Sequence, residues 1–263
     1  MAYIKEYWND KGKRSEQAKK HTEEMERLYG EKIRESIKNS IVYDVDFQSN
    51  KTHSGKSDII VEAEDSVSAI IGHSNECEGR MAVLNFSSYK NPGGMFINGS
   101  KAQEECLCHE SYLYNVLSEF ALSFYDWNNG HKNRALYLNR GLYSPNIMFC
   151  KGKDRVLCDV ITCAAPNRSA AQKYQNVSDE ENRKVLRSRI RFVLDIAKEN
   201  EVDLLILGAY GCGVFGQDAR EVAETFKEYL DTSHKCFGKV VFAIPEGRDK
   251  NLEVFERIFN LNA

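Results

Sequence analysis

The chain has 263 residues, of which 42% are hydrophobic and 29% are charged. This is ordinary globular usage, so the composition excludes a disordered or fibrous chain, and a chain this long buries roughly 70–75% of its surface without disulfides. A net charge of -3 argues against a general nucleic-acid-binding surface. No apolar stretch is long enough to span a bilayer, and the first residues lack the pattern of a signal peptide, so we expect a cytoplasmic protein without membrane contact.

The eight cysteines are scattered along the chain, and several lie in apolar runs where a reduced cysteine acts as a small hydrophobic residue. The segment Cys106-Leu-Cys108-His109 resembles half of a metal site. No second Cys/His cluster with suitable spacing completes it, so we expect structural thiols, no metal and no cofactor.

The first forty residues differ from the rest of the chain because they are dense in mixed charge. Between Arg14 and Asn39 the apolar residues follow a three-and-four spacing, which predicts an amphipathic helix that is kinked near Gly30. We therefore expect an N-terminal helical extension, residues 1–40, packed on a main domain that comprises residues 41–263.

Beyond this extension, short β-type runs alternate with helical patterns. The predicted strands are Ile41–Phe47, Ile59–Ala63, Met81–Phe86, Leu142–Phe149, Val156–Ala164, Val202–Leu207 and Lys239–Ile244. The predicted helices are Ser66–Ile71, Gln103–Phe124, Asp179–Asn200, Asp218–Leu230 and Lys250–Phe259. Such alternation is typical of an α/β domain in which a mixed sheet lies between layers of helices.

Two loops at the carboxyl ends of predicted strands have unusual chemistry, and ligands of α/β sheets bind at such loops. The second one, residues 208–216, holds four glycines between a strand and a helix. Backbone that is free of side chains can bring N–H groups close to a diphosphate, so this pattern favours phosphate binding over a simple tight turn. It also matches the dinucleotide fingerprint, but it lies late in the chain with a single strand after it, which argues against a nicotinamide-dependent oxidoreductase.

The first loop brings carboxylates to the same edge of the sheet. It contains Asn91-Pro-Gly93-Gly94 and leads into Gln103-Glu104-Glu105, which opens a predicted helix. Acidic residues are favoured in the first turn of any helix, but this does not explain the Gly-Gly turn beside them. Adjacent helical residues point about 100° apart, so the two carboxyl groups are expected to have different tasks: one acts on a scissile bond, while its neighbour and Gln103 fix the geometry.

These segments resemble the signature of poly(ADP-ribose) glycohydrolases, a Gly-Gly-Gly run followed six to eight residues later by Gln-Glu-Glu. Further similarity to the microbial-type branch of this macrodomain family is carried by Asn85-Phe-Ser-Ser, Tyr143-Ser-Pro-Asn146, Val160-Ile-Thr-Cys-Ala-Ala-Pro-Asn167 and the segment 208–216. The resemblance implies a macrodomain-like three-layer α/β/α fold with a mixed central sheet and an N-terminal helical extension. The third glycine of the signature is replaced by Met95.

The resemblance also implies roles for single residues. Glu105 would be the catalytic residue, and Glu104 would hold the ribose beside the scissile bond. Gly93 and Gly94 would belong to the catalytic loop, with Asn91 touching the distal ribose and Gln103 nearby. The diphosphate loop would comprise Gly211, Cys212, Gly213, Val214 and Phe215, of which Phe215 positions the distal ribose.

The leading hypothesis is therefore a glycosidase that cleaves the bond at the distal ribose of poly- or mono-ADP-ribose on macromolecules, with a Glu as general acid and base. The alternative is a non-catalytic macrodomain that reads ADP-ribose; the Glu pair favours the enzyme and Met95 favours the reader. The expected partners are ADP-ribose and ADP-ribosylated protein or nucleic acid, and the chain is expected to be a monomer. Phe237 and Phe242 are candidates for stacking on adenine, but a core position is the favoured interpretation for both.

Overall fold

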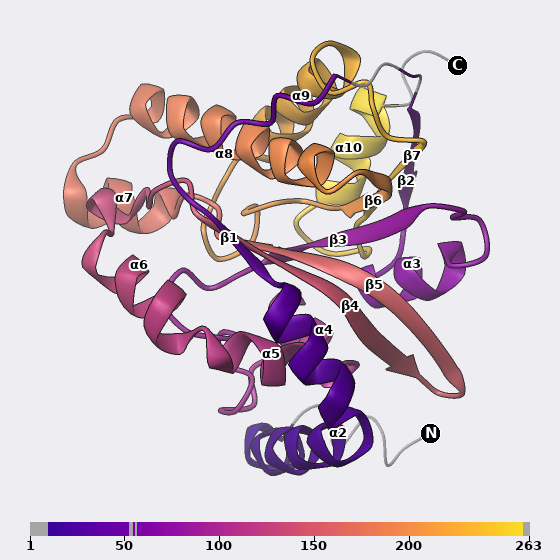
Figure 1. Ribbon diagram of the computed structural model, residues 1–263. Helices are drawn as coiled ribbons and strands as arrows, with labels where there is room; N and C mark the ends of the chain where they lie inside the picture. The colour runs from indigo at the N-terminus through magenta and orange to yellow at the C-terminus, as the bar shows by residue number, and fades with distance from the viewer. Residues whose placement is uncertain (1–9, 53–54, 56, 260–263) are drawn as a thin grey trace.

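The structure, a computed structural model, describes residues 10–259 with the exception of 53, 54 and 56. A seven-stranded mixed sheet, in the order β1-β4-β5-β3-β6-β7-β2, crosses the molecule (Figure 1). Strand β4 is antiparallel to both of its neighbours, and all other neighbouring strands are parallel. The strands are β1 (Ile41–Tyr43), β2 (Asp58–Glu62), β3 (Arg80–Phe86), β4 (Gly141–Lys151), β5 (Asp154–Cys163), β6 (Val202–Leu207) and β7 (Lys239–Ala243).

The central strands are apolar on both faces because both faces are covered. In β3, Met81 and Val83 pack into one hydrophobic core, while Ala82 and Leu84 pack into another on the opposite face. This period of two is what a pleated strand imposes on its side chains. The sheet therefore separates two cores, as in an α/β protein with helices on both faces.

Helices cover both faces and complete three layers, which confirms the predicted α/β/α architecture (Figure 1). On one side lie α2 (Lys11–Asn39), α3 (Ser66–His73), α4 (Gln103–His109), α5 (Leu113–Glu119) and the π-helical turn η1 (Ala121–Asp126). On the other lie α8 (Asp179–Glu199), α9 (Ala219–Asp231) and α10 (Asn251–Phe259). None of the helices in the described part of the chain is long and apolar enough to cross a membrane.

The N-terminal helix α2 is integrated into the core. Its Ala18, Met25 and Ile33 are buried in the same hydrophobic cluster as side chains of the sheet. The predicted kink near Gly30 is confirmed, since Tyr29 has non-helical angles of φ -129 and ψ 16. Residues 1–9 of the predicted extension lie outside the described residues, and the domain boundary at residue 40 stays a prediction.

The prediction of one helix over Gln103–Phe124 is wrong, because this segment is divided into α4, α5 and η1. Ser111 interrupts it: its hydroxyl donates to Leu107 O (2.6 Å) and accepts from Leu113 N–H (3.0 Å). Ser111 also forms a β-bridge with Phe149 of β4. Pairing with the sheet thus overrides the helical periodicity.

Other differences are smaller. Strand β1 ends at Tyr43 instead of Phe47, because the chain turns at Asp44, whose C=O accepts the N–H of Phe47 (3.0 Å). The remaining predicted bounds agree with the structure to within about three residues. The sequence pattern did not reveal α6 (Trp127–Gly130), the short helix η2 (Asn133–Ala135) or α7 (Arg168–Gln175), which have few core-facing apolar residues.

If α2 folds as part of the core, replacing its buried Ile33 must destabilise the whole domain. We expect Ile33→Ala to lower the free energy of unfolding by about 2–5 kcal/mol in a single cooperative transition. The control is Leu28→Ala on the same helix, where the side chain is 51% exposed and the change stays within about 0.5 kcal/mol. Equal effects of the two substitutions in chemical denaturation would show that α2 is not part of the core.

Candidate active site

A cavity of about 580 Å³ opens at the carboxyl ends of β3 and β6, where both unusual loops of the sequence meet. Its wall includes both glutamates and most of the residues predicted from the two loops. From the first loop and α4 come Asn91, Gly94, Met95, Gln103, Glu104 and Glu105; from the second come Gly211, Gly213, Val214 and Phe215. The cavity is therefore the meeting point of the predicted catalytic and phosphate-binding segments.

Glu105 is 6% exposed and lies in the first turn of α4. Its two carboxyl oxygens each accept one backbone hydrogen bond: Met95 N–H donates to Oε1 and Ala102 N–H donates to Oε2, both at 2.9 Å. Two bonds on one planar group fix its position and rotation, and backbone N–H groups offset the cost of burying a charged oxygen.

Glu104 is even more enclosed, at 3% exposure. Its Oε2 accepts from Ser88 N–H (2.7 Å), and its Oε1 accepts from the side-chain amide of Asn85 (3.3 Å). Burial raises the pKa of Glu104 to about 8, although these two hydrogen bonds act in the opposite direction. At neutral pH this carboxyl group therefore retains its proton, which gives the pair one neutral member.

The Gly93-Gly94 turn has the geometry that only glycine accepts. Both residues have positive φ, and a Cβ on Gly94 would lie 2.6 Å from Glu105 Oε1 and 2.9 Å from Glu104 Oε2. Met95, which replaces the third signature glycine, is outside the left-handed region and its side chain is 44% exposed. Its contribution to Glu105 is the backbone N–H, which any residue except proline supplies.

Gln103 borders the cavity, but its carboxamide is engaged inside the protein. The oxygen accepts from Phe86 N–H (2.9 Å), and the nitrogen donates to Leu84 O (2.9 Å) and Ser66 Oγ (3.1 Å). These bonds tie the start of α4 to the end of β3. Both N–H donors of the carboxamide are used, so a hydrogen bond to a ligand, expected from the sequence, has to be accepted by the second lone pair of its oxygen.

The second loop presents most of its predicted residues to the cavity, and Cys212 is the exception. Its thiol lies 3.8 Å from the C=O of Tyr210, and burial raises the pKa of Cys212 to about 12. A thiol of this kind is not ionised at neutral pH, so it is no nucleophile. Val214 is 88% exposed at the rim.

Two tyrosines form part of the cavity wall although nothing in the sequence marked them. The rings of Tyr89 and Tyr137 stack with centroids 4.2 Å apart, and Phe215 of the second loop meets Tyr137 at 6.1 Å. Tyr137 has a φ of 62, and it follows a left-handed turn formed by residues 133–135. The stacked rings connect the catalytic loop to the second loop. No local sequence pattern could have predicted the position of Tyr137, because non-glycine residues rarely adopt the positive φ angles of this turn.

A second cavity of about 340 Å³ adjoins the first, and the two share Phe86, Ala102, Gln103 and Ala209. Together they form an elongated cleft that passes the start of α4. Residues from two further segments line this half and were not predicted: Asp65, Ser66, Val67, Pro245, Glu246, Gly247, Asp249 and Asn251. Phe237 and Phe242 are fully buried, which confirms the core interpretation of both.

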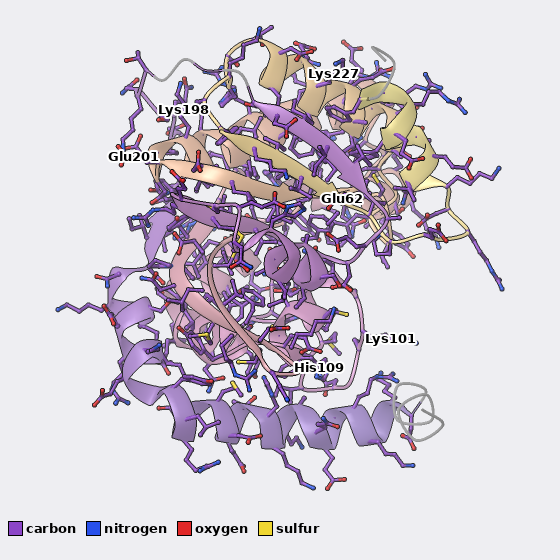
Figure 2. All side chains as sticks on the ribbon, turned by 90° about the vertical axis from the view of Figure 1, so that its right-hand side faces the viewer. Glu62, Lys101, His109, Lys198, Glu201 and Lys227 are labelled. Atoms are coloured by element: carbon purple, nitrogen blue, oxygen red, sulfur yellow. The ribbon has the colours of Figure 1, made fainter. Side chains whose placement is uncertain are left out.

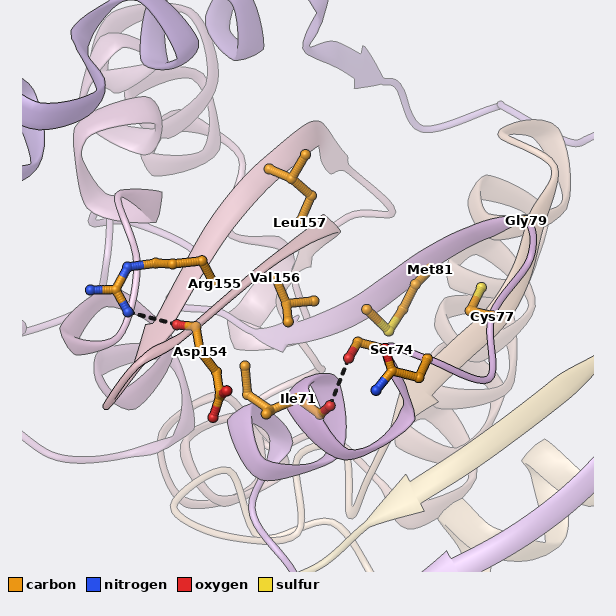
Figure 3. Close-up of a pocket in the computed structure, with 10 residues that line it drawn as sticks. Ile71, Ser74, Cys77, Gly79, Met81, Asp154, Arg155, Val156 and Leu157 are labelled. Carbon is orange, nitrogen blue, oxygen red and sulfur yellow. Dashed lines mark hydrogen bonds between the residues drawn. The ribbon is translucent and has the colours of Figure 1, made fainter.

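A third cavity, of about 530 Å³, lies at the opposite end of the strands (Figure 3). It is bordered by the beginnings of β3 and β5, with Met81 and Val156 among its lining residues, and by the end of α3. The side chain of Arg155 points away from Ile71, and its guanidinium donates to the backbone C=O of Asp154 (2.7 Å). None of the predicted site residues reaches it, so it is separate from the cleft.

No metal is expected from the sequence. Within the described residues, one group of side chains has the spacing of metal ligands: Glu62, Glu64 and His73. Glu62 lies on β2 at the edge of the sheet (Figure 2). The imidazole of His73 is already bonded to Glu62 (2.8 Å) and Glu76 (3.1 Å), and Lys239 Nζ lies 3.3 Å from its Nδ1. We interpret this group as an ion-pair network outside the cleft.

Known proteins are similar to this chain in sequence and in fold. Residues 9–152 match the catalytic domain of microbial-type PARG. The chain belongs to the microbial-type PARG family. It is accordingly a hydrolase of the poly(ADP-ribose) glycohydrolase type.

Solved structures of such enzymes are similar to this chain over most of its length. Poly(ADP-ribose) glycohydrolase from Thermomonospora curvata has 28% identity and a TM-score of 0.83, with 94% of this chain and 99% of that chain covered. The enzyme from Deinococcus radiodurans in complex with ADP-ribose has 29% identity and a TM-score of 0.78, with 88% and 97% covered. Another crystal form of the latter complex has 32% identity and a TM-score of 0.74, with 90% and 93% covered. A search among curated proteins finds no significant match.

The buried carboxyl group of Glu104 makes the stability of the protein depend on pH. Between its ordinary pKa of 4.5 and the raised pKa of about 8, the folded state holds a proton that the unfolded chain has released. Raising the pH through this window therefore lowers the free energy of unfolding, by on the order of 1 kcal/mol per pH unit. Glu104→Gln removes the titrating group, so we expect urea titrations at pH 5 to 8 to give a flatter slope for the variant. Equal slopes would contradict the assignment.

Proposed function

We propose that this chain releases ADP-ribose by hydrolysing the glycosidic bond at the distal ribose of ADP-ribose polymers, with Glu105 as general acid and base. The observation that carries the proposal is the carboxyl group of Glu105 on the wall of the cleft, fixed by two backbone N–H groups. The similar solved structures are poly(ADP-ribose) glycohydrolases, and that from Deinococcus radiodurans is a complex with ADP-ribose.

The cleft suits an elongated ligand with an anionic centre. The half that contains Glu105 also contains the glycine-rich loop, whose bare backbone can donate N–H groups to a diphosphate. The adjoining half, between Asp65 and Pro245, has room for the adenosine part. In this orientation the distal ribose lies beside Glu105 and between Asn91 and Phe215.

The chemistry follows from this orientation. Glu105 in its acid form protonates the leaving oxygen while positive charge develops at the anomeric carbon. The resulting carboxylate then removes a proton from a water molecule, which attacks that carbon and completes the hydrolysis. Glu104, which keeps its proton at neutral pH, can donate a hydrogen bond to a ribose oxygen without adding a second negative charge to the site.

The substrate class is ADP-ribose on macromolecules, protein or nucleic acid, and mono-ADP-ribose is a second substrate to compare with the polymer. The alternative function is a reader that binds ADP-ribose without cleaving it. The feature that favoured the reader in the sequence, Met95, carries less weight in the structure, because its side chain is half-exposed and its backbone N–H serves Glu105.

Glu105→Gln separates the two functions. The amide keeps the shape of the side chain but cannot transfer a proton, and its NH2 group cannot accept the second of the two backbone N–H groups. We therefore expect release of ADP-ribose from poly(ADP-ribose) to fall about 100-fold or more. Binding of ADP-ribose in calorimetry is expected to change little. The matched control is Glu110→Gln, five residues along the same segment and outside the lining of the cleft, which should leave turnover unchanged.

A reader would give a different result: binding of ADP-ribose by the wild type without release from either substrate. Turnover by the wild type that persists in Glu105→Gln would instead assign the acid to another residue. The ratio of the rates on poly- and mono-ADP-ribosylated protein ranks the two substrates.

Substitutions at the neighbouring positions Gly94 and Met95 should affect turnover differently. A methyl group on Gly94 would collide with both carboxyl groups, so we expect Gly94→Ala to reduce turnover about 100-fold. Met95→Gly keeps the N–H that donates to Glu105 and should retain turnover. Steady-state kinetics on poly(ADP-ribose) measures both, and a larger loss in Met95→Gly would show that the Met side chain is part of the site.

A further inference from the structure

The loop between the glycine turn and α4, residues 95–102, controls both hydrogen bonds on Glu105. Met95, at its start, donates to Oε1, and Ala102, at its end, donates to Oε2, each at 2.9 Å. Inside the loop, Met95 O accepts from the N–H groups of Asn98 and Ser100, both at 3.1 Å. The loop is thus closed by its own backbone hydrogen bonds, and its two ends both donate to the carboxyl group of Glu105. A shift of the loop therefore moves both donors.

The middle of this loop is held by the N-terminal helix α2, more than eighty positions earlier in the sequence. The guanidinium of Arg14 donates from Nε to Gly99 O (2.6 Å), and the hydroxyl of Ser15 donates to Ile97 O (2.5 Å). Arg14 is 7% exposed, so its bond is shielded from water. Charge-assisted and shielded hydrogen bonds are the stronger ones, so the Arg14 bond is the stronger of these two anchors.

The backbone of the loop at Gly99 lies so close to the backbone of α2 that no side-chain atom fits between them. Gly99 has a φ of 76, and a Cβ at this position would lie 2.2 Å from Lys11 O and 2.9 Å from Ser15 N. Only glycine satisfies both the backbone angle and the missing space. The contact therefore requires a specific residue in a segment that the sequence signature treats as a spacer.

Side chains fill the space below the loop. Phe96 is fully buried and meets the ring of His109, at the end of α4, with centroids 4.7 Å apart. The ring of His21 on α2 approaches Phe96 at 6.4 Å, and its Nε2 lies 2.8 Å from Ser111 O. Figure 2 shows His109 on the inner side of α2, whose charged side chains point outward. The helix thus contacts the loop and also Ser111, two residues beyond the end of the helix that carries Glu105.

We infer that α2 is a positioning element of the active site, and that Arg14 and Ser15 hold the loop that orients the carboxylate of Glu105. The inference rests on the proposed role of Glu105. The segment 93–99, which comprises the glycine turn and the first part of the loop, has three glycines in seven residues and therefore little rigidity of its own. Proton transfer requires the acid to stay within a fraction of an ångström of its working position, and anchoring to a helix embedded in the core supplies that constraint.

Ser15→Ala removes one anchor with minimal change elsewhere. We expect kcat to fall about tenfold, while the Kd for ADP-ribose and the melting temperature stay close to those of the wild type. Ser15→Thr keeps the hydroxyl and should restore kcat. Thr22→Ala is the control, because the hydroxyl of Thr22 bonds within α2 to Ala18 O and does not reach the loop.

Gly99→Ala tests the close contact, and Gly152→Ala is its matched control. Both residues have positive φ, but nothing lies within 4 Å of a Cβ on Gly152. The two variants share the backbone strain, whereas only Gly99→Ala pushes the loop away from α2. We expect kcat to fall about 100-fold in Gly99→Ala with binding of ADP-ribose retained, and to be unchanged in Gly152→Ala.

Amide hydrogen exchange provides a readout that does not depend on activity. If α2 holds the loop, the amides of Met95 and Ala102 exchange faster in Ser15→Ala and Gly99→Ala than in the two controls. Faster exchange would support the role of α2 in holding the loop even if the wild type released no ADP-ribose. Absence of release would refute only the proposed function. Unchanged exchange, or an active Gly99→Ala, would overturn the inference.

Discussion

The burial of two neighbouring carboxyl groups at the start of α4 is the constraint on which the rest of the site depends. An isolated carboxylate in the protein interior is strongly disfavoured, so each of these groups needs donors or must keep its proton. The fold provides donors for both groups and, for Glu104, a retained proton. Glu105 accepts hydrogen bonds from N–H groups at the two ends of one loop. Glu104 accepts hydrogen bonds from Ser88 and Asn85, and its pKa of about 8 means that it keeps its proton at neutral pH.

The surrounding elements can be understood as the support for this arrangement. Gln103 ties α4 to β3, the Gly-Gly turn leaves room for the carboxyl oxygens, and α2 holds the loop from outside. On the other side of the cavity, the stacked rings of Tyr89 and Tyr137 connect the catalytic loop to the glycine-rich loop. The hydrogen bonds on Glu104 and Glu105 come from residues 85–102, while α2 holds this segment from outside and Tyr137 and the glycine-rich loop complete the cavity wall.

The features that sequence predicted are those with a local physical signal. Short continuous apolar runs place the strands, because a strand that is covered on both faces is apolar at successive positions. The Gln-Glu-Glu motif placed both glutamates on the cavity wall. The missed features depend on tertiary contacts. Ser111 breaks a regular helical pattern by pairing with Phe149, Tyr137 is presented by a left-handed turn, and Gly99 is indistinguishable in sequence from any flexible spacer.

Met95 shows how the same reasoning resolves an apparent defect in the motif. A glycine is required where φ is positive or where a Cβ would collide, and both conditions hold at Gly93 and Gly94. Neither the backbone angle nor the 44% exposure of the Met95 side chain imposes such a requirement on the next position. What Glu105 receives from residue 95 is a backbone N–H, which is independent of the side chain. The replacement therefore changes the rim of the cleft and leaves the hydrogen bonds that orient the carboxylate intact.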